Sequence, residues 1–154
     1  MRIALIAVTR RPSGWLQEGA AEYLKRMPRQ LKVELVEVQP ARSAAASKET
    51  RRREADRISA ATPSGRRIIV LDEHGTLVTS MDLARRLKAW MRQGEDLAFI
   101  VGGADGLDAS VTDTAHETWA LSGLTLPHGL ARLLLIEQLY RASTIIANHP
   151  YHRG

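Results

Sequence analysis

The chain has 154 residues, of which 44% are hydrophobic and 25% charged, and these values are typical of a single globular domain. It contains no cysteine, which excludes disulfides, catalytic thiolates and cysteine-ligated metals. No apolar run approaches the ~18 residues of a membrane span, and residues 1–8 indicate a strand rather than a signal peptide, so we expect a cytoplasmic protein.

The net charge of +5 is unevenly distributed along the chain. Residues 1–67 carry 15 basic and 7 acidic side chains, whereas residues 68–154 carry 7 and 10. The basic half predicts a surface for a polyanion, with the chemistry placed elsewhere. The alternative is a codon bias toward arginine, although such a bias would not explain the asymmetry between the halves.

The first half of the chain alternates between strand and helix patterns. Residues 3–8 predict a buried strand, and apolar side chains at helical spacing after Ser13 predict a helix that Pro28 ends. Residues 32–39 alternate between apolar and charged side chains and predict a second strand, followed by a loop at 40–47. Residues 48–61 predict an arginine-rich helix, which either faces solvent or lines a phosphate groove.

In the second half, residues 68–71 predict a third buried strand that ends at Asp72-Glu73-His74-Gly75. Ser80 is expected to cap a helix that runs through Met91, with Asp82 at its positive end.

Residues 97–101 and 118–122 predict two further strands, and a last helix is expected to start after Pro127 and to run to about Ala147. Uninterrupted apolar strands between helices predict an α/β fold in which helices cover both faces of a parallel sheet. We expect one domain that spans residues 1–154.

Ligands of such folds bind beyond the carboxyl ends of the strands. Three of these ends carry unusual sequence: Leu71-Asp72-Glu73, the glycine loop after Val101, and residues 122–128. Glycines there let the backbone approach a ligand closely. The sequence contains neither a dinucleotide-binding fingerprint nor a P-loop. The alternative interpretation is that these glycines only form tight turns.

The last helix is apolar nearly all round, which predicts either a core helix or a dimer interface. Asn148 is expected to end it in the left-handed conformation, before Pro150. Residues 148–154, which we call the tail, are rich in polar side chains. His149 and His152 lie three positions apart without an evident third ligand, so we expect no metal site.

Two segments, LTLPHGLARLLLIEQLYRA and NHPYHRG, closely resemble the C-terminal signature of the RlmH-type SPOUT methyltransferases. Ala7-Val8, Glu22-Tyr23, Leu71-Asp72 and Val101-Gly-Gly-x-x-Gly-Leu107 extend the resemblance along the whole chain. The resemblance implies an α/β-knot, in which the C-terminal part of the parallel α/β domain forms a trefoil knot, and it implies a homodimer.

The resemblance further implies S-adenosylmethionine-dependent methylation of N3 of a pseudouridine, at position 1915, in the 23S ribosomal RNA of assembled ribosomes. Cofactor contacts are carried over to nine residues, namely Leu71, Gly102, Gly103, Ser122, Gly123, Leu124, Thr125, Leu126 and Pro127.

Family members keep a Tyr-His-Arg terminus beside the cofactor, so Tyr151, His152 and Arg153 are expected to receive the nucleoside. Because N3 of pseudouridine carries an imide proton, the reaction needs a base, for which His152 and solvent are the candidates. Arg153 or Arg141 would stabilise the resulting anion, and Tyr151 would offer a stacking face.

No separate RNA-binding domain is present, so the basic residues of the N-terminal half are expected to face the ribosome. They include Arg10, Arg11, Lys25, Arg26, Arg29 and the arginines after position 50. A non-catalytic ribosome-binding module is one alternative. A reductase is another, although residues 8–15 lack a dinucleotide loop. The role of Asp105, and whether the tail completes its own or a partner's site, stay open.

Overall fold

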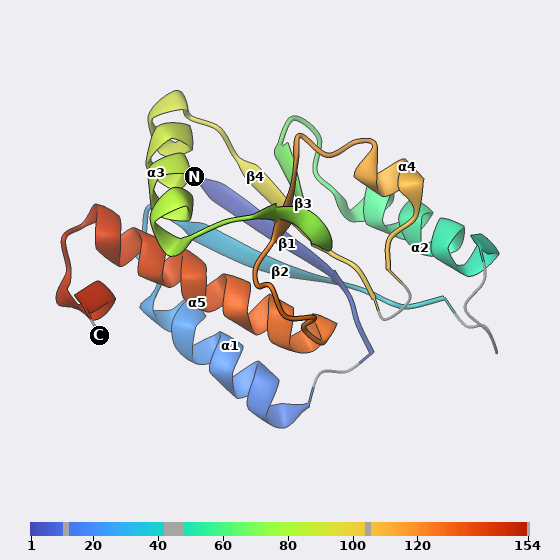
Figure 1. Cartoon of the computed structure of the whole chain (residues 1–154), viewed down its shortest axis with the longest axis horizontal. Coiled ribbons are helices and arrows are strands. Elements are labelled where there is room, and N and C mark those ends of the chain that lie inside the picture. Colours follow the sequence, from blue (N-terminus) through green and yellow to red (C-terminus); the bar gives the residue numbers. More distant parts are fainter. Residues whose placement is uncertain (11–12, 42–47, 104–105, 154) are drawn as a thin grey trace.

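A computed structural model describes residues 1–10, 13–41, 48–103 and 106–153. They form a five-stranded sheet in the order β2-β1-β4-β3-β5, in which every neighbouring pair is parallel (Figure 1). The strands are β1 (Arg2–Val8), β2 (Lys32–Val38), β3 (Arg67–Leu77), β4 (Leu97–Val101) and β5 (Glu117–Ala120). The predicted α/β class is thereby confirmed.

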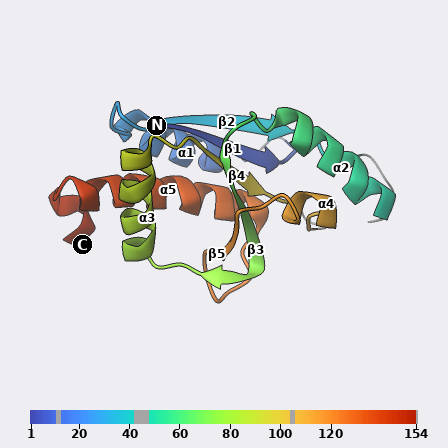
Figure 2. The same ribbon diagram turned by 90° about the horizontal axis from the view of Figure 1, so that it is seen from above.

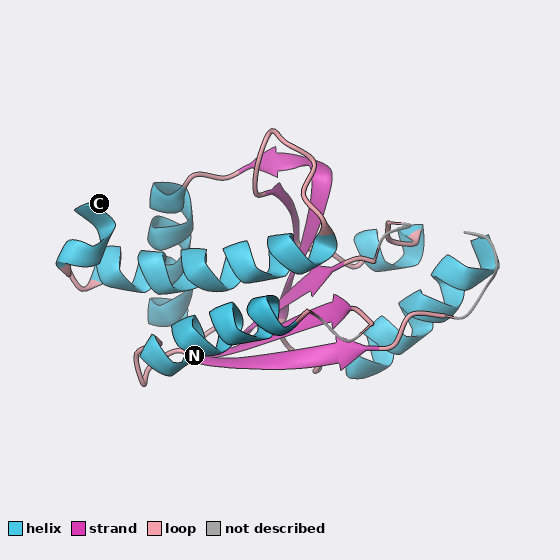
Figure 3. Ribbon diagram, turned by 90° about the horizontal axis from the view of Figure 1, so that it is seen from below, coloured by secondary structure: helices cyan, strands magenta, loops and turns pink. Residues whose placement is uncertain are grey.

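Helices cover both faces of the sheet, as predicted. The helices are α1 (Gly14–Arg26), α2 (Lys48–Ala61), α3 (Ser80–Gln93), α4 (Ala109–Thr112) and α5 (His128–Ile146), followed by the 3-10 turn η1 (Pro150–Arg153). Side chains of α1, α3 and α5 share one core cluster, and side chains of α2 and α4 share the other. Figure 3 shows α1 and α5 side by side, and Figure 2 shows α2 and α4 together at one end of the molecule.

The two core clusters follow from the alternation of side chains along each strand. In β1, Ile3 and Leu5 point into the cluster beneath α1, α3 and α5, whereas Ala4 and Ile6 point into the cluster beneath α2 and α4. All four side chains are buried. A strand that is buried on both faces requires the uninterrupted apolar run that its sequence shows.

Strand β3 is longer than predicted, since it continues through Asp72 and Glu73 to Leu77. Its pairing with β5 shifts register between Leu71 and Thr76, where Thr76 again pairs with Trp119. Gly75 permits this path, because a Cβ there would lie 2.7 Å from the backbone of Trp119. The polar side chains after Leu71 predicted the end of this strand, but main-chain pairing with β5 extends it.

The predicted cap of α3 is also wrong by one residue. Thr79, and not Ser80, caps the helix, because its Oγ1 accepts a hydrogen bond from the Asp82 amide at 3.1 Å. The Asp82 carboxylate accepts the Thr79 amide in return at 3.3 Å, which completes a capping box. The short helix α4 was not predicted.

The end of α5 agrees with the sequence. Asn148 has a φ of 54°, as its predicted left-handed role requires. Its amide and that of His149 satisfy carbonyls of the last turn, at 3.1 and 2.8 Å. Among the described residues, no helix combines the length and hydrophobicity that crossing a bilayer requires. The trefoil knot and the homodimer remain predictions.

Candidate active site

A cavity of about 530 Å³ lies at the carboxyl ends of β3, β4 and β5. Eight of the nine residues that the resemblance assigned to the cofactor line it. They are Leu71, Gly102, Gly103, Ser122, Leu124, Thr125, Leu126 and Pro127. Gly123 is not among the lining residues. The three strand ends chosen from the sequence therefore meet around one hollow.

The glycine loop after β4 brings its backbone to the cavity wall. At Gly102, a Cβ would lie 2.8 Å from Cγ of Leu107, which also lines the cavity. Gly106 has a φ of 76°, and its amide donates to the Gly103 carbonyl at 3.2 Å to close the turn. A side chain at either Gly102 or Gly106 would therefore strain the loop or narrow the cavity.

Another wall of the cavity is the loop between β5 and α5. Within it, Ser122 Oγ accepts a hydrogen bond from the Leu124 amide at 2.9 Å. Thr125 Oγ1 donates to Glu73 Oε2 at 2.7 Å, which joins this loop to the part of β3 that follows Leu71. These two residues lie 52 positions apart, so no sequence pattern could have indicated the bond.

The lining combines apolar side chains with two carboxylates. Asp72 and Glu73 belong to it, and no lysine or arginine does among the described residues. Asp72 Oδ1 accepts a hydrogen bond from the His74 amide at 2.8 Å. The volume falls within the ~300–1,000 Å³ of small-molecule sites. A lining of apolar side chains, glycine backbone and two carboxylates suits a ligand that combines an apolar part with a positive charge.

The tail lies beside the C-terminal half of α5, away from this cavity. Tyr151 is half-buried, and the guanidinium of Arg141 lies 5.0 Å from its ring centroid. Arg141 Nε donates to Glu137 Oε1 at 2.9 Å. The side chains of His152 and Arg153 lie outside the described part of the chain, as do Arg11 and Asp105.

Within one chain, the structure does not bring the two predicted groups of site residues together. Ala131 is the residue of α5 farthest along the helix that lines the cavity, and Arg141 follows ten positions later. At ~1.5 Å per residue, they lie about 15 Å apart along the axis. Figure 1 shows the tail at one end of α5, whereas the loop of residues 122–127 precedes its other end.

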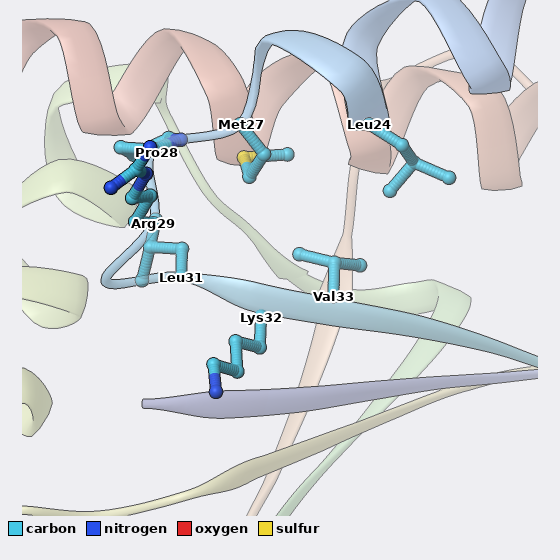
Figure 4. A pocket seen from close by; sticks show the side chains of 7 residues that line it. All are labelled: Leu24, Met27, Pro28, Arg29, Leu31, Lys32 and Val33. Atoms are coloured by element: carbon cyan, nitrogen blue, oxygen red, sulfur yellow. The ribbon is translucent and has the colours of Figure 1, made fainter.

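A second hollow of about 570 Å³ lies between the end of α1 and the start of β2. Leu24 and Met27 face Val33 across it, whereas the Lys32 side chain points to the other side of β2 (Figure 4). It lies at the amino ends of the strands, on the opposite end of the sheet from the glycine loop. Its apolar walls offer no group for methyl transfer.

The basic residues divide between different parts of the fold. Hydrogen bonds from Ser110 lower the pKa of Asp108, and the nearby charges of Arg51 and Arg52 lower it further. The arginines of α2 thus lie close to α4, which follows the glycine loop. Arg26, by contrast, lies among tyrosine rings. Among the residues that the structure describes, no group of three or more histidine, aspartate or glutamate side chains could hold a metal ion.

Residues 1–152 match the sequence model of a family described as "Predicted SPOUT methyltransferase". The chain is 49% identical over 154 residues to the ribosomal RNA large subunit methyltransferase H of Dechloromonas aromatica, with 99% of each chain covered. It is 50% identical over 158 residues to the protein of that name from Ralstonia nicotianae, again with 99% of each chain covered. The Burkholderia ambifaria protein of that name is 48% identical over 156 residues, and the match covers both chains fully.

Proposed function

The chain belongs to the SPOUT methyltransferase family, and from this premise we propose that it methylates the RNA of the large ribosomal subunit. The relatives near 50% identity carry the name of that activity over their full length. The proposal rests on the cavity. Residues that the resemblance assigns to the cofactor come from three segments far apart in the sequence, and they line one hollow at the strand ends. The finer proposal is methylation of N3 of a pseudouridine in the 23S RNA.

S-adenosylmethionine is the proposed donor, and it supplies a methyl group activated by a sulfonium cation. The backbone at Gly102 and Gly103 and the loop from Ser122 to Pro127 would hold it. The lining fits such a group, since glycines leave room for close approach and the carboxylates of Asp72 and Glu73 favour a cation. Loops of this kind position the reactants, which is a large part of catalysis between two bound molecules.

We assign the nucleoside to the tail, and the position of the tail supports a site shared by two subunits. Arg141 lies about 15 Å along α5 from Ala131, the last residue of that helix to line its own chain's cavity, and Tyr151 packs beside Arg141. A two-fold dimer with antiparallel α5 helices would bring the tail of one subunit to the cavity of the other. Arg153 or Arg141 would then stabilise the N3 anion, and His152 or solvent would take the proton.

An apolar surface beside the cavity supports this arrangement. Trp15 is 60% exposed, Leu124 76% and Leu130 38%. Trp15 and Leu130 begin neighbouring helices, since a Cβ on Gly129 would lie 2.8 Å from Leu16. Large apolar side chains exposed together mark an interaction surface. Their position at the cavity end of α5 would place a partner subunit next to the site.

Contact with ribosomal RNA would come from the basic side chains at the same end of the sheet. Arg51 and Arg52 act electrostatically on Asp108, near the glycine loop. Phosphate contacts of this kind position an RNA without reading its sequence. Contacts of this kind would favour a whole ribosome over free RNA as the substrate.

The test is transfer of a labelled methyl group from S-adenosylmethionine to ribosomes that lack the modification. We expect incorporation at N3 of the pseudouridine, located by mass spectrometry of RNA fragments. Ribosomes that carry uridine at that position are the matched control and should accept little methyl. Saturable binding to ribosomes without methyl transfer would contradict the proposal and support a non-catalytic module.

A further inference from the structure

The tail is held by a group of side chains of which only Arg141 has a part in the proposed reaction. We call it the tail socket, and it consists of Tyr23, Arg26, Glu137, Tyr140 and Arg141. Tyr151 enters this socket with its ring packed edge-on against Tyr140, at a centroid distance of 4.8 Å. Its hydroxyl donates to Glu137 Oε1 at 3.0 Å and lies 3.4 Å from the Tyr23 hydroxyl. Both the ring and the hydroxyl of Tyr151 are therefore engaged within the chain.

Arg26 occupies the centre of the tail socket. Its guanidinium carbon lies 4.7 Å from the ring centroid of Tyr140, 5.3 Å from that of Tyr151 and 5.7 Å from that of Tyr23. One of its nitrogens donates to the Tyr140 hydroxyl at 3.3 Å. Three aromatic rings around one cation give favourable electrostatic contacts on several sides. Arg26 is the only member of the socket, among the described residues, that contacts all three rings.

The tail socket holds two cations, Arg26 and Arg141, and one carboxylate, Glu137. Glu137 accepts from Tyr151 and from Arg141, so the carboxylate lies between a neutral donor and a cation. Burial, and then the bonds to Tyr23 and Glu137, raise the pKa of Tyr151 above its ordinary value. Tyr151 thus keeps the proton that it donates to Glu137. A phenol held in this way is an anchor for the chain rather than an acid or a base.

Without the contacts of Tyr151 in the tail socket, the last turn of the chain would be expected to fray. Four residues, Pro150–Arg153, form a single 3-10 turn, and such short turns have little stability of their own. The Tyr151 side chain of this turn reaches Tyr23 of α1, 128 positions away in the sequence. Contacts that fix Tyr151 therefore also restrain the backbone of the two residues that follow it in the turn.

We propose that Arg26 is a positioning residue for methyl transfer: it fixes Tyr151 in the tail socket and thereby holds the backbone of η1, from which His152 and Arg153 would reach the nucleoside. The inference rests on the proposed role of the tail. It changes the role of Tyr151 from a stacking platform to an anchor. It also removes Arg26 from the basic residues that would contact the ribosome.

An arginine suits this position better than a lysine. Its planar guanidinium can lie against several rings while it donates a hydrogen bond, whereas a lysine ammonium is a compact, strongly hydrated charge. The hydrogen bond to Tyr140 raises the pKa of Arg26, so the cation persists at any pH at which the enzyme works. Arg26→Lys should therefore retain only part of the effect.

The experiment compares Arg26→Met and Arg26→Lys with Arg92→Met, a control that removes an exposed arginine at the end of α3. Hydrogen exchange of residues 149–153 measures the anchoring of the tail in the intact protein. We expect exchange at least ~10-fold faster in Arg26→Met, an intermediate rate in Arg26→Lys and the wild-type rate in the control. Unchanged exchange in Arg26→Met would refute the anchor.

Kinetics on ribosomes separate positioning from binding. We expect Arg26→Met to lower kcat by ~10- to 100-fold, because small misplacements of reacting groups carry such costs. The KM for ribosomes and the Kd for S-adenosylmethionine should change little, since neither depends on the tail socket. A change confined to KM would assign Arg26 to RNA contact and overturn the proposal.

A double-mutant cycle with Tyr151→Leu tests whether Arg26 acts through Tyr151. We expect Arg26→Met to have no further effect on kcat in the Tyr151→Leu background. The same loss in both backgrounds would show that Arg26 acts by another route and would overturn the inference. A wild-type protein that transfers no methyl group would refute the proposed function and the positioning role together, whereas failure of the cycle alone would leave the function standing.

Discussion

Replacement of Gly102 by alanine tests the cavity as the donor site. The new Cβ would lie 2.8 Å from Cγ of Leu107 and 3.2 Å from its Cδ2. Apolar carbons pack at about 3.5–4.0 Å, so Leu107 must move by roughly 1 Å. Because Leu107 lines the cavity, it relieves the clash by moving into the space that the donor needs.

The magnitude follows from the cost of overpacking, about 1–3 kcal/mol for an inserted methylene group. If binding of the donor must reverse the shift of Leu107, its affinity falls by this amount, which is ~5- to 150-fold. Calorimetric titration with S-adenosylmethionine measures the change. Gly14→Ala is the matched control, because a Cβ at Gly14 meets nothing within 4 Å.

A second variant makes the reasoning refutable. Truncation of Leu107 to alanine in the Gly102→Ala background removes the atoms that clash, so most of the lost affinity should return. Wild-type affinity in Gly102→Ala, with the fold intact by thermal denaturation, would show that the donor binds elsewhere. A loss that Leu107→Ala does not relieve would contradict the proposed direction of the shift.

Three further predictions concern stability and assembly. Hydrogen bonds from Thr79, then Arg85, lower the pKa of Asp82 from 3.8 to about 2; its contribution to stability is therefore present above pH 3.8 and lost as the pH falls toward 2. Urea unfolding should show this loss in the wild type and a smaller one in Asp82→Asn. Leu135 is fully buried, and Leu135→Ala should lower the free energy of unfolding by about 2–5 kcal/mol in the same assay. Leu130→Asp should shift the proposed dimer toward monomer in sedimentation velocity, and an unchanged dimer would place the interface elsewhere.

Much of the fold follows from local pattern. The range of α2 predicted at residues 48–61 agrees with Lys48–Ala61, and β4 agrees with the predicted strand at 97–101. Apolar runs buried on both faces can satisfy their backbone only in a covered sheet. The continuation of β3 beyond Leu71 could not be predicted in this way, because pairing with β5, and not side-chain polarity, decides where the strand ends.

The candidate site, too, could be predicted only in part from the sequence. Glycine-rich strand ends indicated the cavity, since the carboxyl ends of parallel strands meet at one edge of the sheet. The bond from Thr125 to Glu73 could not be foreseen, and neither could the distance between the tail and the cavity. Resemblance named the residues of the tail, but it did not say which chain's cavity they would serve.

The sequence by itself determined the class of the fold, the strand ends that line the cavity and the family to which the chain belongs. These depend on periodicity, on glycine and on motifs that span a few residues. Only the tertiary structure decided that Arg26 and Tyr151 lie together and that the tail is separated from its own cavity. Such contacts depend on how α1, α5 and the tail pack, and segments more than 100 residues apart leave no local pattern that records their meeting.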